Sequence, residues 1–531
     1  MLPANSLESN KEADQLRAKL ADALSKNQQL ERYNQLLSEQ LRLLLLDKYG
    51  ASSERLSDNQ LALLELEPSV CRAEVLTEAA LEEKAKALDA PQAEKAPEKE
   101  PAQKPVRGPL PAHLPREERI VACAEDQCHC GQCGGRKKLI GYETSERVSI
   151  RPVEFFIEVT KREKLACAKC EELGVSVAEV PPSIIEKGIL SDALLVDVII
   201  KKYLDHQPLY RQAAGMKRDA GIEMSQATLS ASALKAGVLL KEVCQEMKAD
   251  LLAGGYIQAD ETTVPVQSAR TKGKNHQAYL WEYGRPQGAV VYDFRMGRER
   301  EGPEKFLAGY NGRLQIDGYA GYNKVGGADI VYFGCWAHAR RKFFEASKVD
   351  PTDARSVALV VKIGELYAVE AQAREAQLDA AGREALRREK SAPLLNEIKL
   401  LIFEAKPRAL PQSALGKACT YALNQWERLE RYAQAGHGRV EIDNNWAENA
   451  MRGVALGRKN WIHIGSEEAG PKIAAILSVL ETCKRLNIPV REYLEAVLPQ
   501  LAYASTRPKV DCKAADLTPM AWARTRKSPP Q

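Results

Sequence analysis

A heptad repeat of apolar residues is the first regular pattern along the chain. One core position of the repeat is filled by Leu16, Ala23, Leu30, Leu37 and Leu44, and the other by Leu20, Asn27, Asn34 and Leu41. Leucine at one position with recurring asparagine at the other is typical of parallel dimeric coiled coils, in which buried asparagine fixes the register. We expect residues 10–82 to form a coiled-coil dimerisation arm and the protein to be a homodimer or higher oligomer. The alternative is an amphipathic helix packed on its own chain.

The periodic pattern ends at residues 83–115, which consist largely of Pro, Ala, Lys and Glu. Such a segment cannot bury a core and is predicted to be a solvated linker. Residues 116–185 follow and are predicted to be a zinc-ribbon-like module, because two C-x-x-C pairs about 34 residues apart are typical of a structural zinc site. The expected ligands are Cys130, Cys133, Cys167 and Cys170. Cys123, Cys128 and His129 lie close enough to compete, and a redox pair or unligated thiols is the alternative.

Helical periodicity dominates residues 186–250. Segments 191–206, 208–220 and 225–243 read as successive helices, with Gly221 in a turn and Ser225 as a cap, in an arrangement similar to a helix-turn-helix. Its cations are candidate contacts to DNA phosphates: Lys201, Lys202, Arg211, Lys217 and Arg218. A helical bundle that serves only as scaffold is an equal alternative.

From Gly255 the periodicity becomes strand-like. The predicted strands are 256–266, 276–284, 288–295, 312–322 and the start of 329–343, with a helix at 302–309 and another before the fifth strand. This order is found in ribonuclease H-like domains, in which the first and fourth strands are neighbours. Residues 251–349 are therefore expected to be the first part of a catalytic core, and residues 437–484 the second part. Between them, residues 350–436 are predicted to form an all-helical insertion, and residues 485–531 a C-terminal tail region.

Three acidic residues suggest the chemistry of this core. Asp260 and Asp317 are expected at the ends of the first and fourth strands, and Glu448 lies in a predicted helix. Carboxylates are the ligands that magnesium prefers, and two such ions promote in-line displacement at phosphorus; manganese is an alternative ion. We therefore predict that these three acids are catalytic metal ligands. The rival acids are Glu261, Asp293, Glu441 and Asp443, the last of which is expected to cap the Glu448 helix.

Basic residues accompany Glu448. Steps of four and then seven residues from Glu448 put Arg452 and Lys459 on one helix face, and Arg458 lies beside them. These three are candidate contacts to the DNA backbone, and a solvated cationic face is the alternative. Four residues after the fifth strand are further candidates for contacts near the metals or the phosphates: Trp336, His338, Arg340 and Arg341.

Composition adds few constraints. The chain has 531 residues, a hydrophobic fraction of 44%, twelve cysteines and a net charge of +4. This length predicts several domains, and the charge neither requires nor excludes nucleic acid. Because no stretch has the roughly 20 apolar residues of a membrane helix and the N-terminus has no export signal, we expect a cytoplasmic, nucleoid-associated protein with no membrane contact.

The chain also resembles a known family, the DDE transposases of the insertion sequence 66 type. The similarity covers nearly the whole chain, including "CGQC…CAKC", "KKYLDHQPLYRQ", "QADETTVPV", "IDGYAGYN", "GCWAHARRKFFEA" and "IDNNWAENAMRGVALGRKNW". The resemblance implies a ribonuclease H-like domain with a helical insertion, magnesium dependence, an N-terminal zipper and zinc region, and binding of terminal inverted repeats. It implies the triad Asp260, Asp317 and Glu448, although the family usually has arginine where this chain has Asn449.

Together these patterns predict a multidomain α+β protein. The expected function is that of a transposase that cuts element ends and joins them to target DNA, with accessory proteins of the element as further partners. Two alternatives remain: a metal-dependent nuclease that does not join strands, and a non-catalytic DNA-binding protein derived from a transposase.

Overall fold

The computed structural model describes residues 27, 154–166, 175–177, 182–268, 274–350, 352–507 and 512–527. Apart from residue 27, the predicted coiled coil, the linker and all four predicted zinc ligands lie outside these residues. The chain divides into one unit of Met1–Asp89 with Thr160–Gln531 and a second unit of Ala90–Val159, and the description below concerns the first. In it, two short strands, β1 (Lys164–Ala166) and β2 (Val175–Val177), pair antiparallel.

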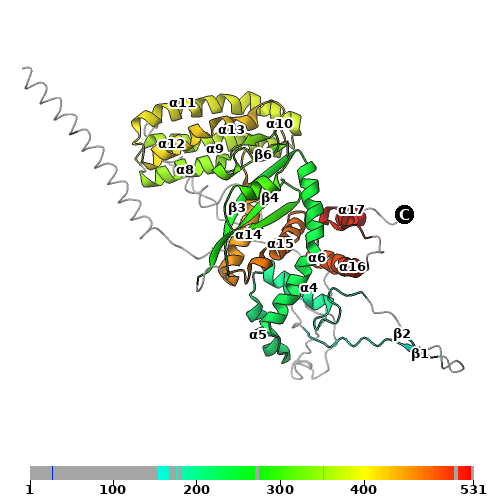
Figure 1. Cartoon of the computed structure of the whole chain (residues 1–531). Helices are drawn as coiled ribbons and strands as arrows, with labels where there is room; N and C mark the ends of the chain where they lie inside the picture. The colour runs from blue at the N-terminus through cyan, green and yellow to red at the C-terminus, as the bar shows by residue number, and fades with distance from the viewer. Residues whose placement is uncertain are drawn as a thin grey trace, which may run out of the picture. The chain divides into compact units, whose positions relative to one another are not determined.

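A five-stranded mixed sheet lies at the centre of the described fold (Figure 1), in the order β5-β4-β3-β6-β7. The strands are β3 (Tyr256–Val266), β4 (His276–Gly284), β5 (Val290–Arg295), β6 (Arg313–Gln315) and β7 (Val331–Phe333). Neighbours β3, β4 and β5 pair antiparallel, whereas β6 and β7 run parallel to β3. All five predicted strands are present, and the first and fourth of them are neighbours.

The last two strands are much shorter than the sequence pattern predicts. Gly318 has a φ of +97°, a conformation that favours glycine, and it turns the chain away from the sheet soon after β6. In place of the second predicted helix there is one 3₁₀ turn, η3 (Ala320–Tyr322). The first predicted helix is present as α7 (Glu301–Phe306).

Three helices precede the sheet, as predicted: α4 (Asp192–Tyr203), α5 (Leu209–Ala220) and α6 (Gln226–Ala253). Ser225 caps α6 by accepting a hydrogen bond from the Thr228 backbone N–H, and Gly221 ends α5 in the left-handed conformation. Helix α6 continues well beyond the predicted end at Val243, because its apolar residues are buried against the C-terminal half of the chain, in contact with α15 (Gly470–Arg485).

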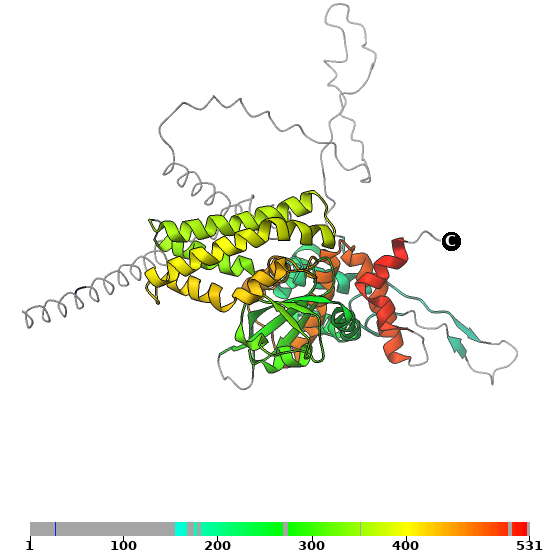
Figure 2. The ribbon, with the colours of Figure 1, turned by 90° about the horizontal axis from the view of Figure 1, so that it is seen from above.

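The segment between β7 and Glu448 folds as a helical bundle (Figure 2). It starts with α8 (Trp336–Val349) and continues through α9 (Ala354–Glu375), α10 (Ala380–Leu386), the π-helical turn η4 (Arg387–Ser391), α11 (Ala392–Arg408), α12 (Ala414–Asn424), α13 (Trp426–Glu430) and η5 (Arg431–Ala433). The helices of the bundle, α8 included, share one hydrophobic core with β7. In this core the rings of Trp336 and Trp426 meet edge to face, with their centroids 5.8 Å apart. The insertion is therefore packed on the sheet domain through its own core.

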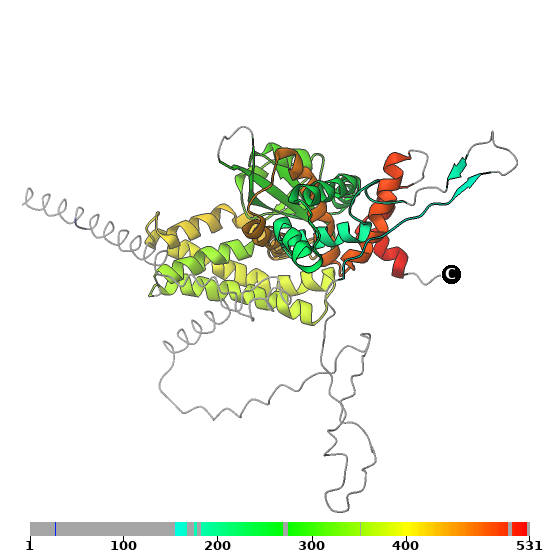
Figure 3. The same ribbon diagram turned by 90° about the horizontal axis from the view of Figure 1, so that it is seen from below.

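After the bundle the chain returns to the sheet. Helix α14 (Asn445–Trp461) packs on β3 and β4, and α15 packs on β5 after the short turn η6 (Glu467–Ala469). Helix α16 (Val490–Thr506) then packs on α4 and α6. It is followed by η7 (Ala514–Leu517) and by the last helix, α17 (Pro519–Lys527), and the C-terminal helices are coloured red in Figure 3. Within the described residues, none of the helices combines the length and apolar character that crossing a membrane requires.

Candidate active site

Asp260 lies in the middle of β3 rather than at its end, which corrects the sequence-based expectation. The parallel pairing of β3 with β6 stops at Gln258, whereas the antiparallel pairing with β4 continues to Val266. Asp260 therefore lies just beyond the parallel part of the sheet, two residues after Gln258. One of its carboxylate oxygens accepts a 2.9 Å hydrogen bond from the backbone N–H of Glu261.

Asp317 follows β6 by two residues, at the start of the turn that Gly318 allows. Its Oδ1 atom accepts a hydrogen bond of 2.8 Å from the Tyr319 backbone N–H. The Asp317 carbonyl accepts a second one from the Tyr421 hydroxyl of α12. The bundle thus helps to hold the backbone that carries this acid.

Glu448 occupies the first turn of α14, and its side chain is only 15% exposed. Two residues of α8 approach it: the Arg341 guanidinium lies 3.2 Å from Oε2, and the His338 Nδ1 atom lies 3.3 Å from Oε1. The contact between His338 and Glu448 does not have the geometry of a hydrogen bond. The Oε1 atom of Glu448 is therefore buried without a hydrogen-bond partner among the described residues.

The three predicted acids lie close enough for their charges to act on one another. Burial, and then the charges of Glu261, Asp317 and Glu448, raise the pKa of Asp260 well above its usual range. Burial lowers the pKa of His338, although Glu448 and Asp317 act in the opposite direction. Carboxylates this close repel one another unless a cation lies between them.

The donor set fits a hard divalent cation. Asp260, Asp317 and Glu448 offer carboxylate oxygens, and Glu448 Oε1 is an orphaned buried acceptor. Cys335, His338 and Glu448 also have ligand atoms within 4.8 Å of one another. Burial raises the pKa of the Cys335 thiol well above its usual range, and a protonated thiol is a poor metal ligand. The oxygen atoms, with the His338 imidazole beside them, are therefore the better donors.

The four rival acids each have partners inside the fold. Glu261 is bound by Arg298 at 2.5 Å and by the Tyr322 hydroxyl at 3.1 Å, and its side chain is 3% exposed. Asp293 pairs with Arg295 at 2.7 Å, and Glu441 with Arg383 at 2.9 Å. Asp443 accepts a 3.2 Å hydrogen bond from the Asn445 backbone N–H at the start of α14, but the N-cap residue itself is Asn444, whose side chain makes no capping hydrogen bond.

The candidate DNA-contacting cations fall into two groups. Three of the five on α4 and α5 are in ion pairs: Lys201 with Asp197, Lys217 with Glu223 and Arg218 with Asp219. Arg211 is exposed and hydrogen-bonds the Tyr210 hydroxyl, and Lys202 lines a pocket. On α14, Arg452 and Lys459 are exposed, whereas Arg458 hydrogen-bonds Thr262 and Thr263 of β3. Arg458 is therefore a fold contact in this structure.

Sequence reasoning missed two contributors to the site. Tyr421 holds the Asp317 backbone from 104 positions away, a separation that no local pattern could reveal. Cys335 lies three residues before His338 in "GCWAHARRKF", and this helical spacing could have suggested a shared face. Of the four residues predicted near the metals or phosphates, His338 and Arg341 approach Glu448, while Arg340 and Trp336 are buried.

The fold combines a mixed sheet, clustered acids and a helical insertion. Comparison of the sequence with known protein families shows which class of protein this is. The family described as "Transposase IS66 family" matches residues 187–472, which are more than half of the chain. Two further families match upstream, described as "Transposase C of IS166 homeodomain" at residues 36–119 and "zinc-finger binding domain of transposase IS66" at residues 127–171. The chain is a transposase. It belongs to the IS66 family.

Uncharacterized proteins of Sinorhizobium fredii are similar over most of their length. The protein y4qI is 33% identical over 74% of this chain and 73% of its own length. The protein y4hP is 32% identical over 77% of this chain and 75% of its own, and y4jD is 31% identical over 75% and 79%. The names of these relatives state no activity.

Proposed function

We propose that this chain is a DNA transposase that binds the terminal inverted repeats of its element, cuts at its ends and joins them to target DNA. The observation that carries the proposal is geometric: Asp260 and Asp317 each lie two residues after the paired residues Gln258 and Gln315 of β3 and β6, and the helix that carries Glu448 packs on β3. The strand order of the sheet supports a ribonuclease H-like core, since the first and fourth strands of the core are neighbours.

The three carboxylates would hold two magnesium ions, with manganese as an alternative. When bound, such ions activate the attacking oxygen and stabilise the leaving one. Asp260, in the middle of β3, would hold these ions together with Asp317 and Glu448. Arg341 would position Glu448 through its 3.2 Å hydrogen bond, and the His338 imidazole lies beside the same carboxylate. A water molecule would be the first nucleophile, and the freed 3′-hydroxyl of the element end the second.

Zinc binding, assembly and DNA contact involve other parts of the chain. The zinc-finger match spans Cys130, Cys133, Cys167 and Cys170, which supports structural zinc at these four ligands. The heptad residues would join two copies, so that one assembly could hold both element ends. The helices α4 and α5, with Arg211 and Lys202, together with Arg452 and Lys459 of α14, would contact DNA phosphates.

Cleavage of a labelled duplex carrying the element's own end tests the catalytic assignment. Asp260→Asn should lower the rate of magnesium-dependent cleavage by about three orders of magnitude, because a carboxylate metal ligand is lost. Asp293→Asn is the matched control, since Asp293 lies on β5 and pairs with Arg295. Equal rates for both variants would contradict the assignment of Asp260.

A further inference from the structure

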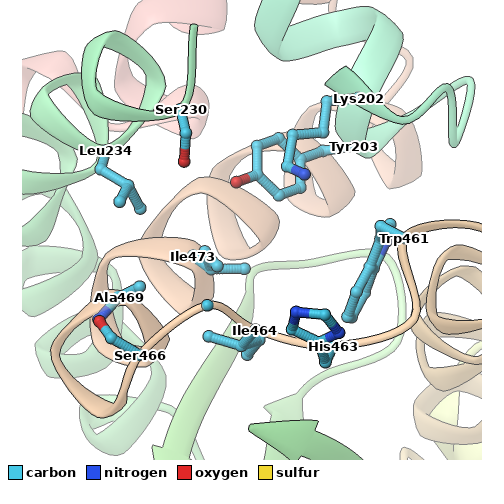
Figure 4. A pocket seen from close by; sticks show the side chains of 11 residues that line it. Lys202, Tyr203, Ser230, Leu234, Trp461, His463, Ile464, Ser466, Ala469 and Ile473 are labelled. Carbon is cyan, nitrogen blue, oxygen red and sulfur yellow. The ribbon is translucent and has the colours of Figure 1, made fainter. Parts of the chain in front are cut away.

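A pocket of about 270 Å³ lies where the end of α14 meets α4 and α6 (Figure 4). Its walls are the rings of Tyr203 and Trp461 and aliphatic side chains such as Leu234. The volume is near the lower end of typical ligand pockets, which span roughly 300–1,000 Å³. Because the pocket is small and has aromatic walls, a small planar group fits it better than an extended chain does.

Three polar side chains of this pocket have no partner in the described part of the chain. The Ser230 hydroxyl, the His463 imidazole and the Lys202 ammonium form no side-chain hydrogen bond or ion pair with any described residue, although Lys202 approaches the Tyr203 ring at 5.4 Å. Burial lowers the pKa of Lys202 to about 8. Polar groups that converge on an aromatic-walled pocket without partners are typical of a ligand site.

The wall that carries Trp461 is held rigidly. Ile462 adopts φ +67° with an exposed side chain, a strained conformation for a β-branched residue. The strain is maintained from both sides: the Ile462 N–H bonds Arg458 in α14, and Ile464 exchanges 2.8 Å hydrogen bonds with Pro265 and Gln267 at the end of β3. The pocket is therefore fixed to the strand that carries Asp260.

The position of the pocket suggests its ligand. Trp461 is 461 − 448 = 13 residues after Glu448 on the same helix, which corresponds to about 20 Å along the helix axis. The exposed cations Arg452 and Lys459 lie between them. The pocket therefore lies at the end of the helix that carries both Glu448 and these two cations.

We propose that this pocket binds one unpaired nucleobase of the DNA, stacked on Trp461, with a neighbouring phosphate at Lys202. The proposal rests on the proposed function, because it requires that the chain act on DNA. Base stacking on an aromatic side chain is sequence-tolerant, since every base has a π-face. The Ser230 and His463 side chains would supply hydrogen bonds to the base edge.

Binding of labelled duplexes to the full-length protein tests this proposal. The probes are one fully paired duplex, the same duplex with a single bulged adenine, and a third with an abasic site at the bulge. The native protein should bind the bulged-adenine duplex about tenfold more tightly than the other two. Trp461→Ala should reduce this preference to less than about twofold, and Trp461→Phe should retain most of it.

Phe403→Ala is the matched control, because Phe403 is an exposed aromatic residue of α11 outside the pocket. It should leave the tenfold preference unchanged, and thermal melting should show that the Trp461 variants are folded. If the native protein binds all three duplexes equally, or if Trp461→Ala keeps the preference, the pocket proposal is wrong while DNA binding stands. If no duplex is bound, the proposed function fails and this inference fails with it.

Discussion

The buried acids of this protein differ in what compensates their charge. Glu370 is held by Arg387 and Arg383, and these partners lower its pKa although burial acts to raise it. Glu282 has Arg485 at 3.7 Å, and burial still raises its pKa to about 8. Asp260 accepts one backbone hydrogen bond, and none of the described cations pairs with it. Of these three acids, the one without a cationic partner among the described residues is thus one of those proposed to bind metal.

Glu282 provides a pH test of this electrostatic description. Its pKa is about 8 in the folded protein against about 4.5 when unfolded, so the native state binds the extra proton. The free energy of unfolding should therefore fall as pH rises from about 4.5 to 8. Glu282→Gln should remove that loss, on the order of 3 kcal/mol. Urea denaturation at pH 5, 6.5 and 8 measures it, and identical pH slopes for native and variant protein would contradict the description.

At the level of elements, α14 depends on the bundle for its position. The segment before α14 is fixed by Arg387, which is 1% exposed and donates to the Tyr432, His437 and Val440 carbonyls while it pairs with Glu370. The π-helical turn η4 starts at Arg387, and such turns are frequent at functional positions. This buried network carries the chain from the bundle back to Glu448.

Breaking the network should destabilise the protein. Arg387→Met leaves the Glu370 carboxylate buried with one cation fewer, which should cost about 3–5 kcal/mol of unfolding free energy. Arg388→Met is the matched control, because Arg388 is the exposed neighbour, and it should change stability by less than about 0.5 kcal/mol. Chemical denaturation of both variants measures the difference. A cost below 1 kcal/mol for Arg387→Met would show that the network is not needed for folding.

The elements that the sequence predicted well are those with strong local patterns. The alternation of apolar and polar residues around Asp260 predicted β3 correctly, and the capping residue Ser225 predicted the start of α6. The bounds of β6 and β7 were not predictable, because Gly318 and the start of α8 at Trp336 end them through turns that alternation does not show. The partners of the site, such as Tyr421 for Asp317, depend on packing between distant segments.

On the scale of the whole molecule, a transposase must combine catalysis with DNA binding and assembly. The match to the zinc-finger family covers both cysteine pairs, and the zipper family matches residues 36–119. These parts precede the region that matches the transposase family, residues 187–472, which contains all three proposed metal ligands. The order along the chain therefore fits recognition and assembly before chemistry.

Zinc content tests the N-terminal part of this account. Cys167→Ser should lower the zinc bound per chain from about one to near zero, because three remaining ligands hold the metal much less tightly. Cys419→Ser is the control, since Cys419 is buried in the helical bundle. Metal analysis after dialysis against a weak chelator provides the measurement. Undiminished zinc in Cys167→Ser would remove that cysteine from the ligand set.

The most direct test of the central claim is strand transfer with element-end DNA, a target plasmid and magnesium. The native protein should join the 3′ ends to the plasmid, and Glu448→Gln should reduce joining by about three orders of magnitude while it still binds the end DNA. Joining at the native rate by Glu448→Gln would contradict the role of the acid, and cleavage without joining by the native protein would contradict the assignment as an active transposase.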